Sequence, residues 1–136
     1  MSRVINPDGV GKERKRLTRA VVLALRELML QPEPNDKSKD LAAFISIALK
    51  EIFDTVDQSV AAWEKRGYWV KADRFRMEWN WTQRTGEAMR AAVLEENWGQ
   101  VAENAAITAQ KLMSTQVPAR HRLGTPWVGS WKKLRE

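Results

Sequence analysis

The sequence has no cysteine and a single histidine, and these shortages exclude several kinds of site. Without cysteine the chain cannot form disulfides, thiolate metal centres or a cysteine nucleophile, and a reducing compartment, hence a cytoplasmic location, is expected. One histidine is too few for a di-iron site of the Glu-x-x-His kind or for a histidine-rich zinc site. A serine hydrolase triad would depend on His121, close to the C-terminal end. The sequence also lacks a glycine-rich phosphate-binding motif.

Long apolar runs are missing as well. No stretch approaches the roughly 20 apolar residues that a membrane span needs. Met1 to Val10 has one charge of each sign and no apolar core, so neither a signal peptide nor a membrane partner is expected. What is present is the composition of a folded protein, with 43% hydrophobic and 29% charged residues. At 136 residues, the chain is expected to form a single domain.

Apolar residues recur three and four positions apart over most of the chain, which predicts an all-helical protein. Four helices are expected, over about residues 10–31, 38–66, 68–93 and 97–115. The third has the most regular pattern, an a/d heptad repeat from Tyr68 to Val93. The second has a wide apolar stripe, which predicts that it packs against more than one neighbour.

Two prolines separate the first two predicted helices. Pro32 and Pro34 end the first helix, because proline removes an amide donor and clashes with the preceding turn. A turn over residues 6–9 is expected to precede that helix. Asp36 or Ser38 is expected to accept hydrogen bonds from the free amides that begin the second helix.

Later boundaries depend on glycine and asparagine. Gly67 stands where a left-handed residue commonly follows a helix, so a tight helical hairpin is expected there. Asn97 with Gln100 predicts a capped start for the fourth helix, and the alternative is that the third and fourth helices form one kinked rod. After Pro118 the periodicity stops, which predicts an extended tail.

Short connections between helices favour antiparallel neighbours. We therefore predict an all-α protein, an up-and-down four-helix bundle with an extended C-terminal tail. In this single domain of residues 1–136, residues 1–9 form an N-terminal turn, residues 10–116 form the bundle, and residues 117–136 form a basic tail that contains tryptophan.

Positive charge is concentrated at the two ends of the chain. The formal net charge is +6. Residues 1–31 hold seven basic residues against three acidic, and residues 117–136 hold five against one, so the middle is slightly acidic. Because cations that neutralise phosphates release counterions, such ends suit an anionic polymer. The alternative is that they only keep the protein soluble.

The first helix and the tail supply the candidate nucleic-acid-binding residues. In the helix, basic side chains recur at spacings that place them on one side, where they can follow a phosphate backbone without reading bases. The candidates are Lys12, Lys15, Arg16 and Arg19, continued by Arg26, together with Arg120, Arg122, Lys132 and Lys133 of the tail. The alternative for the helix is an ordinary solvated face.

Seven tryptophans are present, and four of them are candidates for contact with a partner. Trp69 and Trp81 fall off the main seam of the third helix, beside basic residues, where aromatic rings can stack on bases. Trp127 and Trp131 of the tail are of a type enriched in interaction hot spots. The alternatives are a second packing face for the third helix and docking of the tail on its own bundle.

Few residues of the sequence support an enzymatic function. A magnesium-dependent helical hydrolase would need clustered carboxylates. The candidates are Glu51, Asp54 and Asp57 on the second helix, with Glu87, Glu95 and Glu96 on a facing helix. We expect no catalytic residues, metal or cofactor.

The leading interpretation is a non-catalytic binding protein that contacts nucleic-acid backbone through the basic helix and tail. The rival is a protein-assembly module, a homo-oligomer or adaptor joined through the tryptophan-rich third helix and the tail. No motif identifies a family.

Overall fold

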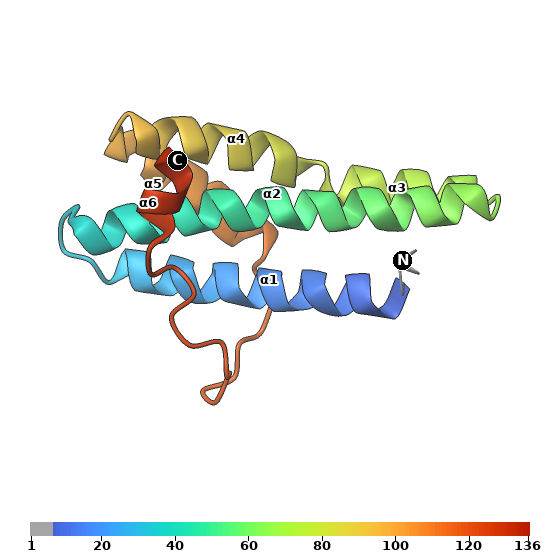
Figure 1. The fold of residues 1–136 in the computed structure, drawn as a ribbon, viewed down its shortest axis with the longest axis horizontal. Coiled ribbons are helices and arrows are strands. Elements are labelled where there is room, and N and C mark those ends of the chain that lie inside the picture. The colour runs from blue at the N-terminus through green and yellow to red at the C-terminus, as the bar shows by residue number, and fades with distance from the viewer. Residues whose placement is uncertain (1–6) are drawn as a thin grey trace.

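In a computed structural model, which describes residues 7–136, the chain is all-helical, and this confirms the predicted fold class. Figure 1 shows the arrangement of the helices, and no strand occurs in the described range. The helices are α1 (Pro7–Met29), α2 (Asp36–Lys65), α3 (Trp69–Trp79), α4 (Trp81–Leu94), α5 (Trp98–Lys111) and α6 (Ser130–Arg135). Within residues 7–136, none of them combines the length and the hydropathy of a membrane span.

α2 is the central element. α1, α3, α4 and α6 all pack directly on it, as the width of its apolar stripe predicts. Its inward side chains Leu41, Ile45, Leu49 and Ile52 are fully buried. α1 lies along one side of α2, and α3 and α4 follow one another along the opposite side (Figure 1). α5 packs on α4 and has few contacts with α1, so the predicted up-and-down four-helix arrangement is not confirmed.

The core has a large and a small part. The large cluster joins α1, α2, α4, α5 and the C-terminal segment. The small cluster consists of Val56, Val60 and Ala72, with the rings of Trp63 and Phe75 packed against it. These two rings meet edge to face, with centroids 4.9 Å apart. The second half of α2 and α3 therefore form a thinner arm that extends from the main body.

Arg14 fastens the beginning of α1 to this arm. Its guanidinium donates hydrogen bonds to the Thr55 carbonyl and to the Ser59 hydroxyl, both at 3.2 Å. It also lies 4.6 Å from the centroid of the Phe75 ring. Burial lowers the pKa of Arg14. This arginine therefore has a structural role and points away from the row of exposed cations on α1.

Two helix starts differ from those predicted. α1 begins at Pro7, within the turn expected over residues 6–9, because proline suits the first turn of a helix. The earlier part of that turn lies outside the described residues. α2 is capped by Asn35, not by Asp36. The Asn35 side chain accepts from the Ser38 amide at 2.8 Å, and the Ser38 hydroxyl accepts from the Asn35 amide at 3.2 Å. Ser38 thus completes a capping box.

The single helix predicted over residues 68–93 is two helices, interrupted at Asn80. The Gln83 amide donates to the Asn80 carbonyl, three residues earlier, at 3.2 Å. The Trp79 carbonyl accepts from the hydroxyl of Thr82 at 2.7 Å. A side-chain hydroxyl that occupies a backbone acceptor competes with the regular helical bonds. The Thr18 and Thr55 hydroxyls make the same bond within the unbroken helices α1 and α2, so this bond alone does not explain the break. The heptad pattern does not reveal the break.

The turn between α4 and α5 follows the prediction. Glu96 has a left-handed backbone with φ of 52°. The Asn97 side chain then accepts a hydrogen bond from the Gln100 amide at 3.1 Å. The capped start at Asn97 is confirmed, and the alternative of one kinked rod is wrong.

The C-terminal tail is folded onto the body, which agrees with the alternative that it docks on its own bundle. Residues 130–135 form a helix within the tail that the sequence predicts to be extended. Residues 112–129, here called the strap, leave α5, pass around α1 and reach α6 on the other side (Figure 1). The Asp40 carboxylate accepts hydrogen bonds from the amides of Gly129 at 3.3 Å and Trp131 at 2.9 Å. Trp127 and Leu134 are buried in the main core. Burial of these side chains explains why the tail docks.

Candidate functional site

A row of four exposed cations runs along the outer side of α1. Lys12, Lys15, Arg19 and Arg26 are exposed, and their spacing along the helix places them on one face. Each has no salt bridge to an acidic residue in the described part of the chain. Their charge is therefore directed at solvent and is available to an anionic ligand.

Arg16, predicted with this row, is in a different state. Its Nε donates to Glu13 Oε2 at 3.0 Å, and the two side chains form a salt bridge three residues apart on the helix. The hydrogen bond from Arg16 lowers the pKa of Glu13. Because this carboxylate offsets its charge, Arg16 contributes less to the positive field than its four neighbours.

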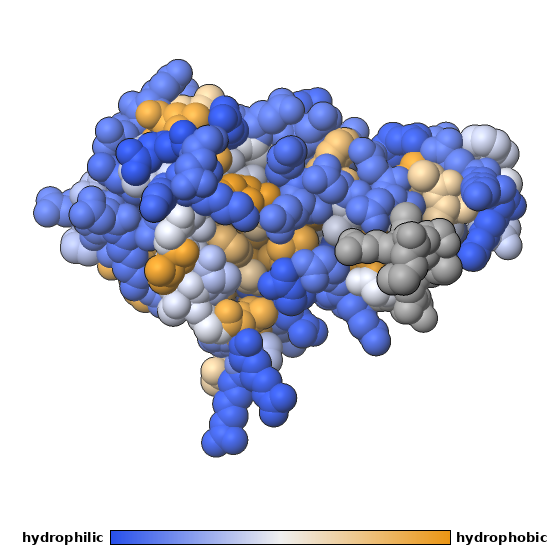
Figure 2. All heavy atoms as spheres, in the orientation of Figure 1, coloured by the Kyte–Doolittle hydropathy of each residue, from blue (hydrophilic) through white to orange (hydrophobic). Residues whose placement is uncertain are grey.

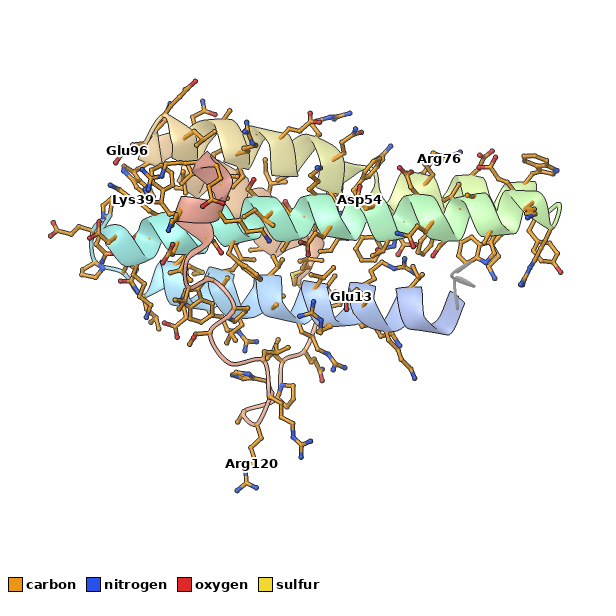
Figure 3. The ribbon with its side chains drawn as sticks, viewed as in Figure 1. Glu13, Lys39, Asp54, Arg76, Glu96 and Arg120 are labelled. Atoms are coloured by element: carbon orange, nitrogen blue, oxygen red, sulfur yellow. The ribbon has the colours of Figure 1, made fainter. Side chains whose placement is uncertain are left out.

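The strap lies against the cationic row. Arg19 and Arg26 line a shallow hollow together with Met113 and residues 115–118 of the strap. Beyond this point the strap projects from the body, with Arg120 at its far end pointing away from the helices (Figure 3). Figure 2 shows this projection as a hydrophilic finger. Arg122 follows in a left-handed backbone conformation, with φ of 46°, and is exposed.

The other two predicted cations of the tail lie elsewhere. Lys132 and Lys133 are exposed on α6, which packs on α2. Lys133 lines the groove between α2 and α4, together with Lys50 and Arg90. The structure therefore brings the part of the strap that precedes Arg120 against the α1 row, whereas Lys132 and Lys133 lie on α6. The sequence predicts the four tail cations as a second set, and the structure divides that set between the strap and α6.

Of the four tryptophans proposed as partner contacts, one is largely exposed. Trp69 has 60% of its surface accessible, whereas Trp127 has 5%. Trp81 and Trp131 are partly buried against the main core, and Arg135 stacks 4.7 Å from the centroid of the Trp131 ring. Trp127 is thus a core residue, and the tail tryptophans dock on their own chain.

Sequence reasoning missed two exposed neighbours of Trp69. Tyr68 and Val70 have 55% and 67% of their surface accessible. The heptad pattern assigned Tyr68 to the packed seam. However, α2 ends at Lys65, so a seam residue at this position has no helix to pack against. The sequence signal for this exposure is Gly67, two residues after the end of α2, because a glycine there marks the turn of the hairpin.

The predicted carboxylates do not form a metal site. Glu51, Asp54 and Glu87 line the same groove between α2 and α4, but Lys50 and Arg90 line it too. Within residues 7–136, no group of three histidine, cysteine or acidic side chains is close enough to hold a metal ion. Of the remaining candidates, Glu96 forms a salt bridge with Lys39 at 3.0 Å.

Compared with known proteins, the chain matches no family model, no curated protein and no solved structure. Its function is therefore argued from its own residues and their geometry.

Proposed function

We propose that this protein is a non-catalytic nucleic-acid-binding protein that contacts the phosphate backbone through one continuous cationic surface. This surface, here called the α1–strap surface, consists of Lys12, Lys15, Arg19, Arg26, Arg120 and Arg122. The observation that carries the proposal is the hollow that Arg19 and Arg26 share with the strap. The strap residues that line this hollow are uncharged, and Arg120 follows two positions after the last of them, Pro118.

The dimensions of the row suit a polyphosphate. Lys12 and Arg26 are fourteen positions apart on one helix, which corresponds to about 21 Å at 1.5 Å per residue. Phosphates of one DNA strand follow each other every ~3.4 Å along a duplex, so the row faces about six of them. Flexible, exposed lysine and arginine side chains contact phosphates without recognising base edges. The proposed binding is therefore independent of sequence.

Salt dependence tests the proposal. The affinity for a labelled random oligonucleotide, measured by fluorescence anisotropy at several salt concentrations, is expected to fall steeply. If all six cations contact phosphates, the slope of log K against log salt approaches about −5 on a duplex. Charge reversal by Lys15→Glu with Arg19→Glu is expected to weaken binding about 10-fold or more, because attraction is replaced by repulsion.

A control with the same change of charge separates the surface from net charge. Lys50→Glu with Arg84→Glu alters two exposed cations on α2 and α4. This pair is expected to weaken binding much less than the pair on α1. Equal losses, or an affinity that ignores salt, would contradict the proposal. A protein that binds no oligonucleotide but self-associates in light scattering would favour the rival function in assembly.

A further inference from the structure

The end of the α2–α3 hairpin carries three consecutive exposed apolar side chains. Gly67, with φ of 83°, turns the chain sharply after α2. Tyr68, Trp69 and Val70 follow, with 55%, 60% and 67% of their surfaces accessible. In Figure 1 this end of the arm extends beyond the beginning of α1. Residues 65–71, here called the tip, therefore present an aromatic pair to solvent at a projecting point.

The charge around the tip is positive on balance, although Glu78 lines a hollow with Lys71 and Arg74. The acidic neighbours Glu64 and Asp73 both pair with Arg76, at 2.6 Å and 3.2 Å. Four cations remain without a salt bridge among the described residues: Lys65, Arg66, Lys71 and Arg74. The Lys71 ammonium lies 4.5 Å from the centroid of the Trp63 ring. An occupant of the tip that complements this charge must be anionic.

The tip lies near the beginning of α1, on the side of that helix that faces away from the cationic row. Val10 and Arg66 line the same small hollow, together with Arg14. Lys12 is two residues after Val10 and begins the row. The tip therefore lies near the end of the row that is remote from Arg26, and a strand that follows the row toward Lys12 reaches Arg66 by passing around the start of α1.

We infer that the tip binds unpaired bases by stacking on Trp69 and Tyr68, so that the preferred ligand is single-stranded nucleic acid. This inference rests on the proposed function of the α1–strap surface. Exposed aromatic rings beside cations are the usual means of holding a single strand, because every base has a flat face and the cations hold the phosphates between bases. In a duplex the bases are already stacked and paired, and this contact is lost.

Substitutions at Trp69 separate stacking from simple burial of apolar surface. Trp69→Leu keeps an apolar side chain without a ring, and Trp69→Phe keeps a ring. Anisotropy is measured with a labelled single strand of about 20 nucleotides and with a duplex of the same sequence. Trp69→Leu is expected to weaken single-strand binding about 5- to 100-fold. Trp69→Phe is expected to retain most of the affinity. Neither variant should change the duplex affinity or the salt slope, because no charge is removed.

The matched control is Met29→Leu, a change at another exposed apolar side chain, with 79% of its surface accessible, at the opposite end of the α1–α2 pair. It is expected to leave both affinities unchanged. Equal binding of single strand and duplex by the wild-type protein, or wild-type affinity in Trp69→Leu, would overturn this inference while leaving the proposed function intact. If the wild-type protein shows no salt-dependent binding to nucleic acid, both this inference and the proposed function are overturned.

Two other occupants give distinct results. Binding to vesicles that contain phosphatidylserine, lost in Trp69→Leu while single-strand binding is retained, would show that the tip contacts a lipid surface. A dimer in light scattering that Trp69→Leu dissociates would show that it contacts a second copy of the chain. Either result overturns the assignment to nucleic acid.

Discussion

Gly86 sets the distance between α4 and α2. A Cβ atom at this position would lie 3.2 Å from the Leu49 Cβ and 3.6 Å from the Ser46 carbonyl oxygen, both of α2. The fully buried Leu49 cannot move toward solvent. The sequence shows the glycine within a helical pattern but not what it faces. Close packing of the two helices therefore explains why Gly86, which lowers helix propensity, stands within α4.

We predict that Gly86→Leu destabilises the protein by at least about 1–3 kcal/mol, because the new side chain overpacks the α2–α4 contact. The free energy of unfolding is measured by urea denaturation followed by circular dichroism. Gly11→Leu is the control, because it makes the same change within α1 where no atom lies within 4 Å of the added Cβ. That variant is expected to be neutral or to gain up to about 0.8 kcal/mol from helix propensity. Equal effects would contradict the packing role of Gly86.

At the scale of elements, one acidic side chain of α2 caps the start of α6. Asp40 accepts a hydrogen bond from the amide of Gly129, the residue before α6, and another from the amide of Trp131 in the first turn of α6. This contact takes the place of a side-chain cap, which α6 lacks. Trp127 enters the core just before this turn. The strap is therefore fixed at its C-terminal end by one carboxylate and one buried ring.

We predict that Asp40→Ala loosens α6 and the strap while α1 to α5 remain folded. A lost cap costs about 0.5–2 kcal/mol. Hydrogen exchange of the Trp131 amide is expected to accelerate about 2- to 30-fold, and proteolysis within residues 118–126 is expected to accelerate with it. Asp57→Ala, at an exposed carboxylate further along α2, is the control. Unchanged exchange at Trp131 would show that Asp40 does not hold α6.

The predicted elements agree with the structure where local chemistry decides, and they differ where tertiary packing decides. Gly67 and Asn97 mark the ends and starts expected of them, because left-handed turns and helix caps involve only neighbours in sequence. The break at Asn80 interrupts a regular heptad pattern, and that pattern does not reveal it. The docking of α6 depends on Asp40, about 90 residues away. No periodic signal in the tail reports such a distant partner.

At the scale of the whole molecule, the charge layout of the sequence resolves into two surfaces. Met113 and residues 115–118 of the strap share a hollow with Arg19 and Arg26, and Arg120 and Arg122 follow shortly after them in the strap. Lys132 and Lys133 are carried to α6 by the same strap. The sequence identified every one of these cations, but their division depends on the path of the strap around α1. That path is set by Trp127 and Asp40, so the fold of the tail decides which charges act together.

This division predicts that two variants of equal net charge differ in binding. Arg120→Gln with Arg122→Gln, and Lys132→Gln with Lys133→Gln, each remove two positive charges from the total of +6. Removal of two phosphate contacts should make the slope of log K against log salt shallower by about 2 in the first pair. The second pair should keep the wild-type slope, because its cations lie on the other surface. If both pairs shift the slope equally, binding follows net charge and the α1–strap surface has no special role. If only the second pair shifts it, the interface lies on α6. The local geometry of the strap therefore has a measurable consequence for the whole molecule.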